Sequence, residues 1–263
     1  MNFARLFENP VFSLTLSHRW RRVGKICIAV IVQSAMLLVI CQLLMRAKLG
    51  QFSNLIFLAE AFLILIVSPY LACRTLNRHH NLRMSDTILL LSPIRSRSIL
   101  ARLLFESQIY SLCFLGVTLI VFTISAGELL RYKVILLHVV FIVFIFSGAS
   151  IAALVWNFFR HLLFAVETVY LLWAFLIGGV FLLSPLERYL ENLQPIISPF
   201  LHINPLIALC HLLEMDIFRT PTLYELTPIP SYLFVYPAWY QVCGWQVLLG
   251  CLCCILASRK MSN

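Results

Sequence analysis

Long apolar runs recur along most of the 263-residue chain, and they constrain its fold more than any other feature. A helical residue advances about 1.5 Å and the hydrocarbon core of a bilayer is about 30 Å thick, so a run of about 20 residues crosses once as a helix. The runs with this length and almost no charge are Ile26–Met45, Leu55–Cys73, Ile109–Ser125, Val134–Trp156, Leu162–Leu183 and Trp239–Ala257. The sequence therefore predicts an all-α, polytopic integral membrane protein with six transmembrane helices, in a single domain over residues 1–263.

The composition excludes several classes of protein. Hydrophobic residues make up 61% of the chain and charged residues only 12%, against about a quarter charged in an average soluble domain. Spans and short connections leave no room for a soluble catalytic domain or a nucleic-acid-binding domain. The phosphate-binding pattern G-x-x-x-x-G-K-[ST] is also missing. We therefore expect no enzyme activity, no bound cofactor or metal of the chain's own, and no nucleic-acid partner.

The distribution of lysine and arginine predicts the orientation. With a cytoplasmic N-terminus, the inner segments hold 14 of the 20 basic residues and the outer segments hold six. Cytoplasmic loops of membrane proteins carry this excess of basic residues. We therefore expect a multi-pass protein of the cell's inner (cytoplasmic) membrane with both termini in the cytoplasm. The same topology, with attraction to anionic lipid, accounts for the net charge of +9.

The segment before the first run, residues 1–25, is basic and cytoplasmic in this topology. Residues Asn9 to Arg22 are typical of an amphipathic helix lying along the membrane surface, because Asn9 suits the cap and Pro10 the first helical position. The alternative is that this segment is only the basic flank of the first span.

The inner loop over residues 74–108 is too long for a simple connection. Its apolar stretch Thr87 to Leu91 follows Ser85 and Asp86, either of which can cap a short helix, and Pro93 must end that helix. A second helix is expected to begin near Ser96 and continue into the third span. The short helix needs a surface to bury its leucines, either a partner protein or the lipid surface.

Prolines divide the outer region between the fifth and sixth spans, residues 184–238, where eight of the 11 prolines lie. Asn204-Pro205 predicts the start of an apolar helix from Pro205 to Leu213. About nine residues cannot cross a bilayer that requires about 20. This helix must therefore dip into the membrane and return, or pack on the outer end of the bundle.

Two acidic residues lie inside apolar runs, Glu60 in the second and Glu167 in the fifth. Each would cost about 2.5 to 3.5 kcal/mol if it faced lipid at mid-depth, so we expect both to face the bundle. They are candidates for a substrate path or a proton relay. The alternatives are an interhelical hydrogen bond for Glu60 and, for Glu167, a side chain that reaches the nearby membrane surface.

Cysteines and small residues in the spans have simpler interpretations. Cys251, Cys253 and Cys254 lie in an apolar run without a nearby histidine, so we interpret them as packing residues. Cys210 and Cys243 could both lie on the oxidising side, but nothing else in the sequence supports a bridge between them. His211 and Glu214 have a spacing that suits two metal ligands, but no further ligand accompanies them, so we interpret them as polar surface residues. The triplet Gly148-Ala149-Ser150 and the pair Gly178-Gly179 are typical of close helix contacts.

The stretch from Asp86 to Ile94, followed by Ile99-Leu100, resembles the first cytoplasmic loop of the membrane subunits of type-2 ABC transporters (the ABC-2 type). The layout also resembles that family, with an inner amphipathic helix, six spans and short outer helices between spans five and six. Differences lie at Arg78, His79 and His80, where that family has an acidic pair, and at Ser85-Asp86, near its usual glycine.

This resemblance implies a permease subunit that exports an unidentified substrate, in a homodimer or beside a second permease subunit. A separate ATP-binding cassette subunit would bind and hydrolyse the ATP. The loop helix would be the coupling helix that docks on this ATPase through Asp86, Thr87, Leu90, Leu91, Pro93, Arg95 and Arg97. Two alternatives remain open, a proton-coupled secondary carrier and a non-transporting membrane anchor or assembly factor.

Overall fold

The described part of the chain is 93% helical and contains no strand. The computed structural model describes residues 50–83, 96–125, 128–181, 183, 193–216 and 235–262. These form α3 (Gly50–Arg83), α4 (Ser96–Ser125), α5 (Glu128–Phe159), α6 (Leu162–Gly178), α7 (Gln194–Ile203), α8 (Pro205–Leu213) and α10 (Trp239–Ser262). The all-α prediction is confirmed for these residues. The predicted first span, Ile26–Met45, and the surface helix within residues 1–25 lie outside them.

Five of the described helices are long and apolar enough to cross a membrane. Their candidate spans are Ile56–Arg78, Leu103–Ile124, Arg131–Phe159, Leu162–Phe181 and Trp239–Lys260. Each contains most of one run that the sequence predicted to span. The chain is therefore a multi-pass membrane protein.

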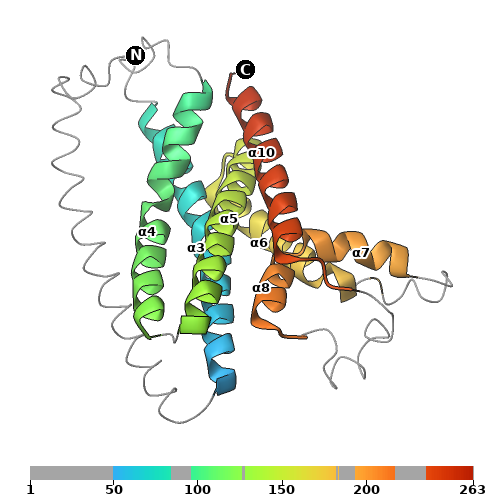
Figure 1. Cartoon of the computed structure of the whole chain (residues 1–263). Helices are drawn as coiled ribbons and strands as arrows, with labels where there is room; N and C mark the ends of the chain where they lie inside the picture. The colour runs from blue at the N-terminus through green and yellow to red at the C-terminus, as the bar shows by residue number, and fades with distance from the viewer. Residues whose placement is uncertain are drawn as a thin grey trace.

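Helix α5 is the centre of the bundle. It contacts α3, α4, α6, α8 and α10, and Figure 1 shows it between α3 and α10. Its fully buried side chains include Leu137, Phe141, Phe144 and Ile151. These residues are four, three and seven positions apart, so they share one face of α5, which is buried in the bundle.

Small residues allow the closest helix contacts, as predicted. A Cβ atom built on Gly250 of α10 would lie 2.6 Å from the Phe146 ring of α5. One built on Gly179 would lie 2.9 Å from the Phe200 ring, whereas one on Gly148 would make an ordinary contact, at 3.4 Å, with the Pro69 ring of α3. A Cβ on Gly178 would meet nothing within 4 Å, so only the second glycine of that pair is needed for packing.

The helix predicted from Asn204-Pro205 has the predicted bounds. Asn204 caps α8 by accepting a hydrogen bond at 3.0 Å from the amide of Leu206, and its own amide group donates to the Ile177 carbonyl at 2.9 Å. Helices α7 and α8 meet at 86° across Asn204. As Figure 1 shows, α7 projects sideways while α8 lies beside the lower part of α10. Nearly all of α8 is buried, so it is an internal part of the bundle.

The bundle has two chemically different ends. At one end, which we call the basic end, α3 finishes at Arg83, α4 begins at Ser96 and α10 finishes with Arg259 and Lys260 in its last turn (Figure 1). The rings of His80 and Trp156 meet there, and Asn157 donates a hydrogen bond to the Ala257 carbonyl. At the opposite end, α3 and α5 begin and α8 finishes.

Candidate functional site: a buried polar cluster among α3, α4 and α5

Glu60 lies inside the bundle, as predicted, with only 6% of its surface exposed. Two other polar side chains meet it there, Thr118 of α4 and His138 of α5, and both are also buried. All three lie within candidate spans. We call Glu60, Thr118 and His138 the polar triad.

Hydrogen bonds join the polar triad through the threonine hydroxyl. Thr118 Oγ1 lies 2.7 Å from Glu60 Oε1 and 3.1 Å from His138 Nε2. The other ring nitrogen, His138 Nδ1, lies 2.8 Å from the Val134 carbonyl oxygen of its own helix. The second carboxylate oxygen of Glu60, Oε2, has no hydrogen-bond partner among the described residues. One hydroxyl therefore bridges an acid and a base from two other helices.

Aromatic rings close the triad toward the opposite end of the bundle. The centroids of Phe57 and Phe122 are 5.0 Å apart, and that of Phe122 is 6.4 Å from the His138 ring. Both phenylalanines are buried. Phe141 also packs against the imidazole, with centroids 5.6 Å apart.

Polar side chains continue from the triad toward the basic end along α4. Ser111 and Gln108 lie seven and ten residues before Thr118, on the same broad face of the helix, and both are buried. Ser111 Oγ and Gln108 Oε1 have no hydrogen-bond partner among the described residues. We call Thr118, Ser111 and Gln108, with the α3 residue Ser68 that Gln108 contacts, the polar seam.

At the basic-end side of the seam, neighbouring helices bind the backbone of α3 around Pro69. Gln108 donates to the Ser68 carbonyl at 3.1 Å, and the Ser68 hydroxyl donates to the Ile145 carbonyl of α5 at 3.1 Å. Tyr170 of α6 donates to the Ile66 carbonyl at 2.9 Å. A proline inside a helix removes one backbone hydrogen bond and disturbs the adjacent turn. Side chains from α4 and α6 bind two carbonyls of that turn, those of Ser68 and Ile66.

Glu167 does not lie where we expected. Its side chain is exposed on α6, so the prediction that it faces the bundle is wrong for the described residues. The physical reason is its position, because it is the sixth residue of α6 and a long side chain can reach the membrane surface from there. The structure does not bring Glu60 and Glu167 together.

Most of the predicted coupling residues lie outside the described residues. These are Asp86, Thr87, Leu90, Leu91, Pro93 and Arg95. Arg97 is the second residue of α4, whose start at Ser96 is where the sequence predicted it.

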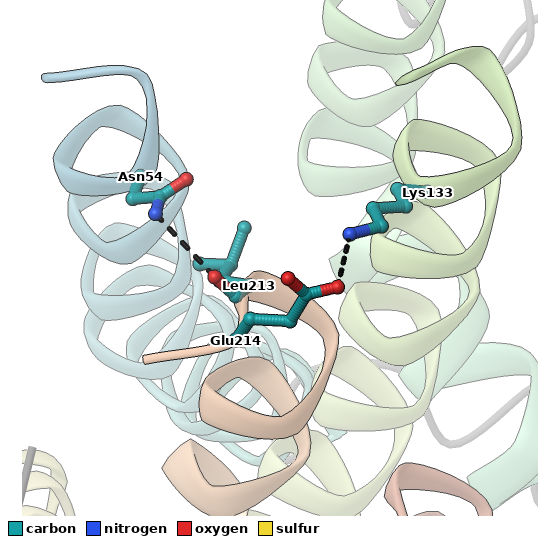
Figure 2. Close-up of polar contacts among 4 residues, drawn as sticks. All are labelled: Asn54, Lys133, Leu213 and Glu214. Carbon is teal, nitrogen blue, oxygen red and sulfur yellow. Dashed lines mark hydrogen bonds and ion pairs between the residues drawn. The ribbon is translucent and has the colours of Figure 1, made fainter. Parts of the chain in front are cut away.

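A second polar contact fastens the end of α8 at the opposite end of the bundle, drawn in Figure 2. Lys133 Nζ of α5 lies 2.6 Å from Glu214 Oε1, and Asn54 Nδ2 of α3 donates to the Leu213 carbonyl at 3.4 Å. Glu214 ends the helix in the left-handed conformation, with φ of 54°. Its pKa is lowered, first by the hydrogen bond from Lys133 and then by the lysine's charge. Glu214 is thus an ion-pair partner, and His211 is exposed on the same helix.

Metal and disulfide sites find no support among the described residues. No group of three or more His, Cys, Asp or Glu side chains there is placed to hold a metal ion. Cys210 and Cys243 are both free thiols. Cys254 contacts the Ser150 hydroxyl at 3.2 Å across the α5–α10 contact, which agrees with a packing role.

Sequence reasoning missed His138 and Thr118. The signal for His138 was available, because an ionisable residue inside a predicted span is a candidate functional residue whether it is an acid or a base. Thr118 had no signal of its own, since its role depends on how α4 aligns with α3.

The comparisons with known proteins add no family to this geometry. No family model, curated protein or solved structure matches the chain.

Proposed function

We propose that this chain is the membrane-spanning permease subunit of an ABC-2 type transporter, exporting its substrate with ATP hydrolysed on a separate subunit. The observation that carries this proposal is that two long helices, α3 and α4, flank the loop whose sequence resembles that family. α3 has 34 residues and is roughly 51 Å long, well beyond the hydrocarbon core of about 30 Å. Only residues 84–95 separate its end from the start of α4.

This arrangement supplies the mechanical connection that such a transporter needs. A displacement of the loop would act on the end of α3 and the start of α4, which flank it, and α3 packs directly on α5 and α6. Hydrolysis on a partner can move spans only through such rigid elements. The substrate path would lie between two permease subunits, either a homodimer or a heterodimer, in the inner membrane with the basic end in the cytoplasm.

The test is physical association with the ATPase encoded nearest to this chain. The two proteins are co-expressed and the full-length membrane protein is purified from detergent by a C-terminal tag. We expect the ATPase to co-purify with the unchanged chain and to be lost from Leu90→Asp and Leu91→Asp, because a charge on the docking face opposes burial there.

Val235→Asp is the matched control, since Val235 is 90% exposed and lies in the connection before α10. It introduces the same charge at a position outside the loop and should leave co-purification unchanged. Retention of the ATPase by both loop variants contradicts the coupling role. Transport by the purified chain alone, abolished when a proton gradient is removed, contradicts the whole proposal in favour of a secondary carrier.

A further inference from the structure

The polar triad has a fixed donor at one end. A carbonyl oxygen can only accept a hydrogen bond, so the 2.8 Å contact with the Val134 carbonyl requires a hydrogen on His138 Nδ1. In a neutral imidazole the other nitrogen, Nε2, is then an acceptor. That acceptor faces the hydroxyl of Thr118 at 3.1 Å.

The triad lacks one hydrogen if Glu60 is ionised and His138 is neutral. Thr118 carries a single hydroxyl hydrogen, and it faces Glu60 Oε1 at 2.7 Å and His138 Nε2 at 3.1 Å. The Leu115 carbonyl, at 3.1 Å, is a third acceptor for the same hydrogen. This one hydrogen cannot satisfy both Glu60 Oε1 and His138 Nε2, so at least one of these buried acceptors faces the lone pairs of Thr118 Oγ1 without a hydrogen bond. Buried polar groups without partners are rare in proteins.

One added proton completes the arrangement in two equivalent ways. On Glu60, the acid O–H donates to Thr118 Oγ1 and the Thr118 hydroxyl donates to His138 Nε2. On His138, the Nε2–H donates to Thr118 Oγ1 and the hydroxyl donates to Glu60 Oε1. We propose that Glu60, Thr118 and His138 form a binding site for one proton, which passes between the carboxylate and the imidazole through the threonine hydroxyl.

The transfer step balances without any other reactant. The Glu60 O–H bond breaks as its proton binds Thr118 Oγ1, and the original Thr118 hydroxyl proton binds His138 Nε2. A neutral acid and a neutral imidazole become a carboxylate and an imidazolium, with the threonine hydroxyl unchanged in composition. Reversal of the two bonds returns the proton to Glu60.

Charge favours one proton over none or two. With one proton, the triad has no net charge in either arrangement. Without it the triad carries −1, and with two protons it carries +1. A net charge among buried side chains at membrane depth is costly, so the neutral occupancy is the stable one.

Other titratable groups on the packed helices lie away from the triad. On α3, α4 and α5 each is at least five residues from the triad member of its helix, and Glu167, His211 and Glu214 on α6 and α8 are exposed. The titratable groups with described side chains are Tyr70, Cys73, Arg74, Arg78 and His80 on α3; Glu106, Tyr110 and Cys113 on α4; Arg131, Tyr132 and Lys133 on α5; Glu167 and Tyr170 on α6; Cys210 and His211 on α8, with Glu214 at its end; and Tyr240, Cys243, Cys251, Cys253, Cys254, Arg259 and Lys260 on α10. Glu60 is therefore the counter-charge for a proton on His138.

The surroundings indicate the side from which the proton exchanges. Phe57 and Phe122 close the triad toward the opposite end, whereas the polar seam leads from Thr118 toward the basic end. From Thr118 to Gln108 the seam rises about 15 Å along α4. We therefore expect the proton to exchange from the basic-end side, where these polar side chains lie.

The protonation states can be measured directly in the full-length protein in lipid nanodiscs, and the result does not depend on any ATPase partner. The protein is labelled with ¹³C at glutamate carboxyl groups and ¹⁵N at histidine rings for NMR. Signals that disappear in Glu60→Gln and His138→Gln assign the two groups. At pH 7 we expect one proton between them, as an acid with a neutral imidazole or as a carboxylate with an imidazolium. A carboxylate beside a neutral imidazole, or an acid beside an imidazolium, overturns the proposal.

Two substitutions of the bridging residue test the shared proton. Thr118→Ser keeps the hydroxyl, so the Glu60 and His138 signals should still change together as pH is varied. Thr118→Val keeps the shape and removes the hydroxyl, so this joint change should be lost. Identical titrations in the unchanged chain and Thr118→Val contradict the transfer route. If Thr118→Val does not elute as folded protein, the proton count in the unchanged chain still decides the proposal.

Discussion

Two glutamates packed against the same helix, α5, behave as opposites. Glu60 is almost completely buried and reaches a histidine of α5 through a hydroxyl, whereas Glu214 is exposed and contacts Lys133 of α5 directly. Glu214 has a full counter-charge and solvent beside it, and its pKa is lowered. The base near Glu60 is His138, which becomes a counter-charge for the carboxylate only when it binds a proton. Burial thus changes the same side chain from an ion-pair partner into a proton carrier.

The largest effect is expected from Glu60→Lys, which places a cation beside His138 without a partner. The variant should lose about 3 kcal/mol of stability. The measurement is the fraction of protein that stays soluble and monodisperse after heating in detergent. Glu60→Gln is the control, since it keeps the shape and a donor for Thr118. Equal stability of the two variants contradicts a fully enclosed site.

Thr118→Val should have the next largest effect. It leaves Glu60 Oε1 and His138 Nε2 without the hydroxyl, and an unpartnered buried acceptor costs about 1–3 kcal/mol. The midpoint of thermal unfolding, followed by tryptophan fluorescence, should fall. Thr118→Ser should recover most of the loss, and a Thr118→Ser midpoint as low as that of Thr118→Val would assign the loss to packing instead.

A smaller effect, with a defined pH dependence, is expected from Glu214→Gln. Because the folded-state pKa of Glu214 is lowered, the ion pair stabilises the fold above the unfolded-state pKa, and this contribution is lost as pH falls through the folded-state pKa. The unchanged chain should therefore melt higher than Glu214→Gln at pH 7, and the difference should vanish in acid. High salt should reduce it as well, because the pair is exposed. A difference that persists in acid contradicts the ion-pair explanation.

The smallest effect is expected from Asn54→Ala. Its hydrogen bond to the Leu213 carbonyl is long, at 3.4 Å, and partly exposed, so its loss should cost about 0.5 kcal/mol. The thermal midpoint is the measurement, and Glu214→Gln in the same experiment gives the scale. A loss larger than that of Thr118→Val would reverse the order that burial predicts.

The sequence predicted the parts of this fold that local chemistry determines. Apolar length identified the five described spans, and Asn204-Pro205 located α8, because a cap and a first-turn proline act within one turn. The cost of a buried charge singled out Glu60. The same argument misplaced Glu167, because depth along α6 decides whether a long side chain can reach the membrane surface.

Side-chain partners were beyond sequence reasoning. The contact of Glu60 with Thr118 joins residues 58 apart, and that of Thr118 with His138 joins residues 20 apart on a third helix. Both depend on how far α4 slides along α3 and α5, which large side chains such as Phe141 and Phe144 determine together. No single pattern in the sequence contains that alignment.

Pro69 interrupts the backbone hydrogen bonds of α3, and hydrogen bonds to neighbouring helices stabilise the turn around it. A force on the end of a long helix would bend it where a backbone hydrogen bond is missing. At that turn, hydrogen bonds with Gln108, Ile145 and Tyr170 connect α3 to three other helices. A force applied at Arg83 would therefore be shared by four helices around Pro69, which is nine residues along α3 from Glu60 of the polar triad. Displacement of the loop between α3 and α4 and occupancy of the proton site at Glu60 would then be coupled.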